Sequence, residues 1–175
     1  QPLREESDTI TGIIVIATDV TSSVKAQHAL AESEKQFRNF IMQSPIPMTI
    51  FRGEDFVIEM ANKVMFEKIW RRKEEEVIGK KVTDAFPELV EQKYPELLRK
   101  VFTSGKPHQE AESVAYVMGS DGMSKFYLDF EYAPLFETDG RVSAIMITVN
   151  DVTEKVNARK KVEDAEERLR IAMES

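Results

Sequence analysis

The feature that most constrains this chain is a three-residue segment, Asp-Val-Thr, which occurs twice at the same kind of boundary. Asp19-Val20-Thr21 and Asp151-Val152-Thr153 each follow an apolar, β-branched run and precede a charged run with helical spacing. Asp151 lies 132 positions after Asp19, and this alignment pairs residues 2–38 with residues 134–170 without a gap. Because solenoid repeats have periods of roughly 20 to 50 residues, each copy is expected to belong to a separate domain.

The repeat predicts how the 175 residues are organised. Residues 1–21 are expected to be the C-terminal strand or strands of a preceding domain, and residues 22–40 a linker or N-terminal helix. Residues 41–153 are expected to form one complete domain, followed by a C-terminal linker helix over 154–175 that leads to a next domain. The chain begins at Gln1 and ends within a helical pattern, so we expect it to be a piece of a longer protein.

Composition excludes several classes of function. The formal net charge is −7, and basic clusters such as Arg71-Arg72-Lys73 are short, which argues against nucleic-acid binding. No segment approaches the roughly 20 apolar residues of a membrane helix, so no membrane contact is expected. The absence of cysteine excludes disulfides, zinc–thiolate sites and thiol catalysis. An acidic chain of this kind suits the cytoplasm.

Hydrophobic periodicity predicts two strands, a helical block and three further strands. The strands are expected over 48–52, 56–60, 109–118, 125–135 and 142–149, and the helices between residues 62 and 103. Asn62 is a suitable N-cap, and Pro95 implies a break or a new start in the last helix of the block. Strand runs separated by helices indicate an α+β domain with an antiparallel sheet.

Two apolar seams with alternating steps of four and three residues lie on the expected flanking helices, a spacing typical of coiled coils. They consist of Ala26, Leu30, Ser33, Phe37 and Phe40, and of Ala158, Val162, Ala165, Leu169 and Ala172. Both seams are short, and the second is rich in small residues, so a dimer would need help from the domains. The alternative is a solvated helix with one face on its own domain.

The order of several short motifs resembles that of a PAS domain. They are Glu34-Lys-Gln-Phe37-Arg38, Ser44-Pro45, Asn62, Val77-Ile78-Gly79-Lys80, Phe86-Pro87-Glu88, the hairpins at Asp121-Gly122 and Asp139-Gly140, and the closing Asp151-Val152-Thr153. Each motif is common by itself, and their order together with the repeat makes the set specific. The resemblance covers essentially the whole chain.

This resemblance implies a PAS fold, a five-stranded antiparallel sheet of order 2-1-5-4-3 with short helices on one face. It also implies a non-catalytic sensory or relay module in the tandem PAS region of a bacterial signalling protein, most often a histidine kinase of a two-component system. The expected partners are a second copy of the chain, bound through the flanking helices, and neighbouring PAS and output domains. The alternative is a dedicated receptor for a small molecule.

The implied pocket would lie between the sheet and the helices. The expected lining residues are Met48, Ile50, Met65, Phe126, Leu128, Phe130, Ile145, Ile147 and Val149. An apolar cavity is the default site for a small ligand, although such a stripe is also typical of a plain core.

The resemblance disfavours the common cofactors of the family. Light-sensing relatives need a pocket cysteine for flavin chemistry, and haem-binding relatives carry an axial histidine on the central helices, where residues 62–103 contain none. His108 beside a turn is expected to be exposed and not a metal ligand. His28 lacks the sequence context of a phosphoacceptor, and no glycine-rich phosphate loop is present, so catalysis is not expected.

The segment Asp151, Val152, Thr153 and Glu154 is the expected junction for signal relay. Asp151 and Glu154 have capping-box spacing, so the Asp side chain would accept early helix amides while Glu154 reaches back. A junction of this strength, about 1 kcal/mol, could be biased by a change in the sheet. A static cap without a switching role is the alternative.

Overall fold

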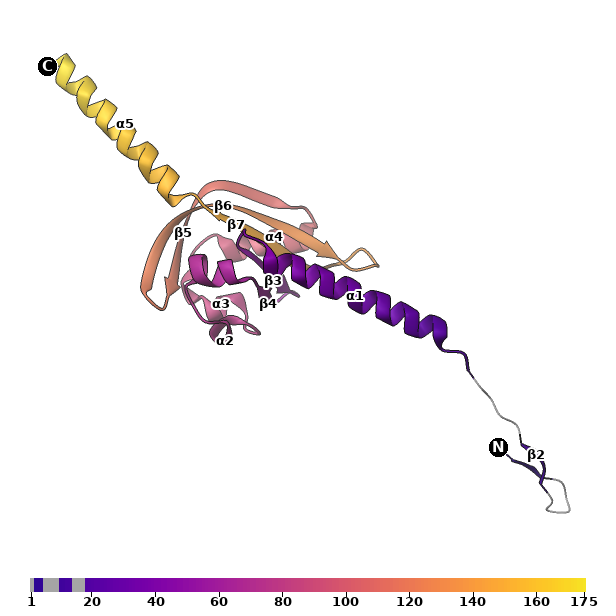
Figure 1. The fold of residues 1–175 in the computed structure, drawn as a ribbon. Coiled ribbons are helices and arrows are strands. Elements are labelled where there is room, and N and C mark those ends of the chain that lie inside the picture. The colour runs from indigo at the N-terminus through magenta and orange to yellow at the C-terminus, as the bar shows by residue number, and fades with distance from the viewer. Residues whose placement is uncertain (1, 5–9, 14–17) are drawn as a thin grey trace. The chain divides into compact units, whose positions relative to one another are not determined.

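The computed structural model describes residues 2–4, 10–13 and 18–175, so part of the expected strand at 10–17 lies outside the described residues. The chain forms two compact units, Gln1–Arg38 and Asn39–Ser175, and each is described by itself. Figure 1 labels the main elements. In chain order they are β1 (Pro2–Arg4), β2 (Ile10–Ile13), α1 (Thr21–Gln43), β3 (Met48–Arg52), β4 (Val57–Ala61), η1 (Met65–Trp70), α2 (Glu74–Val77), α3 (Val82–Ala85), η2 (Pro87–Leu89), α4 (Tyr94–Ser104), β5 (His108–Gly119), β6 (Gly122–Phe136), β7 (Val142–Asp151) and α5 (Thr153–Glu174).

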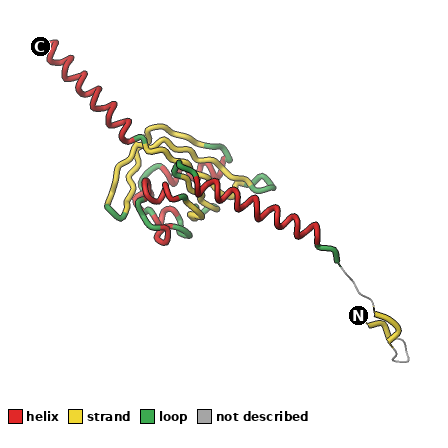
Figure 2. The backbone as a smooth tube through the Cα atoms, viewed as in Figure 1, coloured by secondary structure: helices red, strands yellow, loops and turns green. Residues whose placement is uncertain are grey.

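Five strands of the second unit form one antiparallel sheet, which Figure 2 shows in yellow. The strand order is β4-β3-β7-β6-β5, which is 2-1-5-4-3 when the strands are numbered within the unit. The predicted α+β fold with this sheet is therefore confirmed. Among the helices of the described residues, none is long and apolar enough to cross a membrane.

The main core lies between the sheet and the helical block η1 to α4. Phe86, Leu98 and Val101 from the helical side pack with Ile145 of β7, and all four are at most 2% exposed. Burial of each such side chain stabilises the fold by roughly 1.5 to 3 kcal/mol. This face of the sheet therefore supplies most of the apolar burial of the unit.

A smaller cluster covers the opposite face of the sheet at β3, β4 and β7. Its buried members are Ile41, Met48, Ile50, Met60 and Ala144. Ile41 belongs to the last turn of α1, so the end of this helix packs on the sheet. The interior strand β3 is consequently buried on both faces.

The helical block begins at Asn62, as the sequence predicts. The Asn62 Oδ1 atom accepts the backbone N–H of Met65 at 3.0 Å, the bond expected of an N-cap. The segment η1 that follows is π-helical and ends at Arg71, whose φ is +52°. π-helical turns often mark functional sites.

Pro95 begins a new helix instead of interrupting a long one. The expected helix over 88–103 is divided into η2 and α4, with Pro95 in the first turn of α4. A proline is tolerated in the first turn, where its missing N–H would have no intrahelical acceptor. Gly105, with φ of +64°, ends α4 in a left-handed conformation.

The described part of the first unit repeats the end of the second. The strands β1 and β2 pair antiparallel with each other. Their register is Pro2↔Ile13, Leu3↔Gly12 and Arg4↔Ile10, and that of β6 and β7 is Pro134↔Ile145, Leu135↔Ala144 and Phe136↔Val142. Each pair is offset by the same interval as the sequence repeat, and the irregularity after the second pair is shared. The helices α1 and α5 start at Thr21 and Thr153, which are also equivalent.

Candidate functional site

A cavity of about 80 Å³ lies between the sheet and the helices that cover it. Strands β3, β5, β6 and β7 form its floor, and η1, α3, η2 and α4 its walls. The lining residues are Thr49, Phe51, Met65, Ile69, Trp70, Val82, Leu89, Tyr94, Pro95, Leu98, Ala115, Val117, Leu128, Phe130, Tyr132, Ile147 and Val149. None of these described residues carries a charged side chain.

Hydroxyl groups provide most of the polarity of this lining. The Thr49 hydroxyl donates to the Met60 carbonyl at 2.8 Å, and the Tyr94 hydroxyl donates to the Val114 carbonyl at 2.7 Å. Burial raises the pKa of Tyr94 and that of Tyr132 above their ordinary values. Both phenols are protonated near neutral pH and burial keeps them so, which leaves each with a proton to donate.

Five of the nine residues expected in the lining lie there: Met65, Leu128, Phe130, Ile147 and Val149. Met48 and Ile50 do not, because they face the smaller cluster on the other side of the sheet. In β3 it is Thr49 and Phe51 that face the cavity. Strand β3 is buried on both faces, so apolar alternation does not reveal which side chains point to the helices.

Phe126 and Ile145 are buried in the main core but do not line the cavity. Phe126 instead packs under the Arg71 guanidinium, whose carbon lies 5.3 Å from the ring centre. Sequence reasoning missed the walls contributed by Trp70, Tyr94 and Leu98, because helix-to-sheet docking cannot be read from local periodicity. The amphipathic pattern of α4 is the one indication that its apolar side faces the sheet.

The junction between β7 and α5 differs from the expected capping box. The Asp151 carboxylate accepts the Thr153 N–H at 2.9 Å and the Thr153 hydroxyl, but it makes no cap bond to the helix N–H groups further along. No hydrogen bond from Glu154 back to the start of the helix is formed within the described residues. The capping-box prediction is therefore wrong, since Asp151 lies one residue before the N-cap Val152 and binds only the first residue of the helix, Thr153.

Instead of capping α5, the junction attaches it to β6. The Tyr127 N–H donates to the Thr153 hydroxyl oxygen at 3.0 Å, and the Val152 N–H donates to the Tyr127 carbonyl at 2.9 Å. The side chains of Val152 and Val156 are buried against the domain. The Asp-Val-Thr segment therefore has three roles. Asp151 forms a turn, Thr153 binds the backbone of β6, and Val152 buries its side chain against the domain.

The first copy of the segment has the same local turn. The Asp19 carboxylate accepts the Thr21 N–H at 2.9 Å, the distance found between Asp151 and Thr153. Hydrogen bonding by Thr21 lowers the pKa of the Asp19 carboxyl. The local geometry of the junction thus follows from the three residues themselves.

Two further contacts connect the first turns of α5 with the sheet. Arg159 binds Glu112 through two N–H···O bonds of 2.7 and 2.8 Å, and this pairing lowers the pKa of Glu112. The Lys160 ammonium donates to the Tyr127 hydroxyl at 2.6 Å and lowers the pKa of that phenol. The start of α5 is therefore held by β5 and β6 together.

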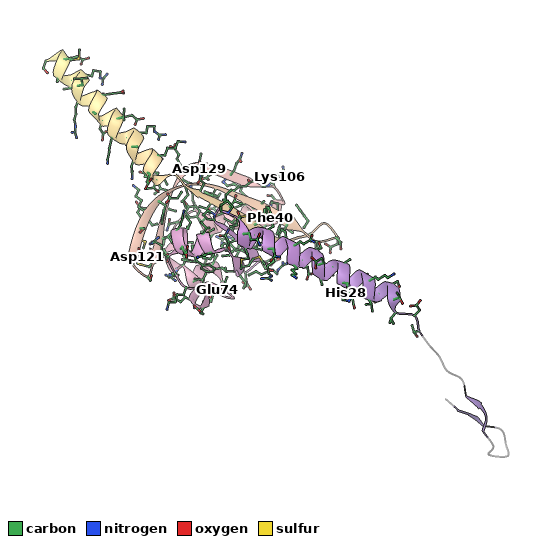
Figure 3. The ribbon with its side chains drawn as sticks, in the orientation of Figure 1. His28, Phe40, Glu74, Lys106, Asp121 and Asp129 are labelled. Carbon is green, nitrogen blue, oxygen red and sulfur yellow. The ribbon has the colours of Figure 1, made fainter. Side chains whose placement is uncertain are left out.

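Glu112 lies in a bulge of β5 that the sequence did not predict. Its φ is +52°, and the β5–β6 register shifts between Glu110 and Ser113. The Glu112 N–H donates to the carboxylate of Asp129, which Figure 3 labels, at 2.8 Å. On the other side of the bulge, Tyr94 binds Ser113 and Val114. The bulge thus connects a wall of the cavity with α5.

The basic cluster noted in the sequence has a structural role. Arg71 binds Asp121 at the tip of the β5–β6 hairpin (Figure 3), and it also donates to the Val117 and Gly122 carbonyls. Arg72 donates to backbone carbonyls as well, those of Met118 and Ala85. These guanidinium groups hold the hairpin against η1.

The two histidines do not form a metal site. His108 is half-buried, not exposed as expected, and its Nε2 lies 3.0 Å from a Glu110 oxygen. His28 lies on an exposed part of α1 (Figure 3). Within residues 2–4, 10–13 and 18–175, no group of three or more potential metal ligands comes together.

The sheet order, the helices on one face and the cavity between them are the features of a PAS domain. A family model described as the PAS fold matches residues 42–157, which is more than half of the chain. The chain therefore belongs to the PAS family.

Solved structures of low sequence identity share this fold. The PAS domain of Bordetella pertussis BvgS has 19% identity and a TM-score of 0.58, covering 78% of this chain and 98% of that one. A sensory box sensor histidine kinase from Vibrio cholerae has 21% identity and a TM-score of 0.50, covering 73% and 98%. An RNA-binding light-oxygen-voltage receptor has 17% identity and a TM-score of 0.57, covering 95% of this chain but 43% of its own length.

Proposed function

We propose that this chain is a non-catalytic sensory and relay module of a multidomain signalling protein. The observation that carries the proposal is the attachment of α5 to the sheet at the Asp-Val-Thr junction and at the β5 bulge. The likeness to a sensor histidine kinase and to the BvgS PAS domain supports a signalling role, with a histidine kinase as the parent. The cytoplasmic location expected from composition is part of the proposal.

The relay would run from the cavity wall to the flanking helix. Tyr94 lines the cavity and binds Val114, the bulge places Glu112 two residues before Val114, and Glu112 binds Arg159 of α5. Allosteric coupling energies of about 1 to 3 kcal/mol are typical, and the loss of one hydrogen bond is of this size. A change at Tyr94 would thus alter how firmly the first turns of α5 are held.

We expect Tyr94→Phe to increase amide exchange in the first two turns of α5 by about fivefold, since one lost hydrogen bond costs about 1 kcal/mol. Glu112→Gln, which weakens the contact with Arg159 directly, should affect the same amides. Hydrogen exchange followed by mass spectrometry measures both. Tyr116→Phe is the matched control, because Tyr116 lies on β5 with its side chain exposed and outside the cavity. Unchanged exchange in α5 of Tyr94→Phe would rule out this route.

Tandem arrangement is a further part of the proposal. The repeat of the β6–β7 register in β1 and β2 supports a preceding domain of the same kind, with residues 1–21 as its end. The exposed apolar seams on α1 and α5 support a homodimer through the flanking helices. In α5 these include Val162 and Leu169, which are 57% and 62% exposed.

Light scattering of the chain at high concentration should therefore detect a dimer. Leu169→Asp would bury a charge in the seam and should weaken association at least about tenfold. Asn157→Asp adds the same charge on the exposed surface of α5 outside the seam, and should leave association unchanged. A strictly monomeric wild-type chain would contradict the dimer.

A second candidate function is a receptor for a small molecule, which the apolar cavity favours. This candidate involves neither haem nor flavin, for the reasons drawn from the sequence. The two functions are compatible, because a ligand at Tyr94 would act on the same bulge.

A further inference from the structure

The chemistry of the cavity lining restricts what it can bind. A cavity that holds one water molecule has a volume of about 10 to 15 Å³, and a pocket for a drug-sized ligand has a volume of about 300 to 1,000 Å³. A cavity of about 80 Å³ lies between these limits. Without charged lining groups, the site would leave an ionised ligand unpaired, which is costly. A neutral, largely apolar molecule about one ring in size fits best.

The Tyr132 hydroxyl adds a polar requirement. Tyr132 is 6% exposed, lines the cavity, and packs its ring 4.8 Å from that of Phe130. Every fully enclosed side-chain nitrogen or oxygen atom of the described residues has a hydrogen-bond partner. No group of these residues hydrogen-bonds to the Tyr132 hydroxyl, so this oxygen keeps some accessible surface, and the cavity is the space that Tyr132 lines.

The other tyrosine in the wall differs from Tyr132. The Tyr94 hydroxyl uses its proton for the Val114 carbonyl, whereas no acceptor among the described residues takes the proton of Tyr132. The indole N–H of Trp70 is likewise a donor on the lining without a protein acceptor in the described part of the chain. Both groups can therefore donate to an acceptor, and the indole N–H can do nothing else, whereas the phenol oxygen can also accept.

We propose that the cavity binds a small, neutral, mostly apolar molecule that has one hydrogen-bond acceptor, and that Tyr132 donates to this acceptor. The inference rests on the second proposed function, the small-molecule receptor. Phe130, which packs between Tyr94 and Tyr132, offers an aromatic surface for a ring.

Acetophenone and α-methylstyrene form a matched pair of probes, because they differ only in a C=O group in place of C=CH₂. Titrations followed by protein NMR give the dissociation constant of each. Tyr132→Phe preserves the ring and is expected to weaken acetophenone binding about fivefold, since a hydrogen bond contributes about 1 kcal/mol and 1.4 kcal/mol is tenfold. Binding of α-methylstyrene should change by less than about twofold.

Ala115→Val serves as a second variant. The larger side chain on β5 reduces the cavity volume and should weaken the binding of both probes. If both probes bind and Tyr132→Phe affects them equally, the role of Tyr132 is refuted and the receptor function remains. If neither probe produces shifts at residues lining the cavity, the cavity is plain core, and both the inference and the receptor function fall.

Discussion

Replacing Asn62 by alanine is expected to lower the free energy of unfolding by about 3 to 4 kcal/mol, because the change removes several buried hydrogen bonds at once. Asn62 is 0% exposed. Its side chain connects the end of α1, the following turn, β3 and η1. Its partners are the N–H groups of Met48 and Met65 and the carbonyls of Ile41, Ser44 and Ile46.

The loss has two components. Met48 and Met65 keep buried N–H groups without an acceptor, and the helical block loses its cap, which alone is worth about 1 kcal/mol. Urea denaturation measures the change in unfolding free energy. Asn39→Ala removes the same side chain from an exposed position of α1 and should cost less than about 0.5 kcal/mol. A loss below about 1 kcal/mol for Asn62→Ala would contradict its role as a connecting residue.

Arg71→Ala is expected to destabilise the domain by about 3 kcal/mol, since hydrogen bonds of a charged donor contribute about 1.5 to 3 kcal/mol. The Arg71 side chain is 14% exposed and donates to the Ile69, Val117 and Gly122 carbonyls at 2.9 to 3.0 Å. Those bonds hold the β5–β6 hairpin against the end of η1. Removing them should also increase amide exchange at the tip of the hairpin.

Asp121→Ala separates the role of the ion pair from that of the backbone contacts. Arg71 lowers the pKa of Asp121, but this carboxylate is largely exposed, so solvent screens the pair. We therefore expect Asp121→Ala to cost much less unfolding free energy than Arg71→Ala in the same urea experiment. Equal losses for the two variants would mean that the surface ion pair, and not the contacts with the hairpin carbonyls, matters most.

Local sequence patterns predicted the orientation of a strand correctly where one of its faces is buried and the other exposed. The alternation of Phe126, Leu128 and Phe130 identified the buried face of β6, because that strand has one exposed face. In β3 both faces are buried, so Met48 and Ile50 were assigned to the wrong one. The capping box failed for a different reason, since Thr153 competes for Asp151 within the turn.

The long-range contacts of the site were beyond such reasoning. Glu112 and Arg159 are 47 positions apart, and neither belongs to a motif. Their contact depends on a bulge with a positive φ at Glu112, a conformation that a non-glycine residue adopts only when its surroundings impose it. Arg71 was noted only as part of a basic cluster, although tertiary packing turns it inward.

By itself, the sequence determined the repeat, the order of strands and helices, and the turn at each Asp-Val-Thr segment. These follow from apolar periodicity, turn chemistry and hydrogen bonds between residues two or three positions apart. Only the tertiary structure decided which face of β3 meets the helices, which helical residues line the cavity, and which strands hold α5. Those features depend on how two surfaces pack, and packing joins side chains that are distant in the chain.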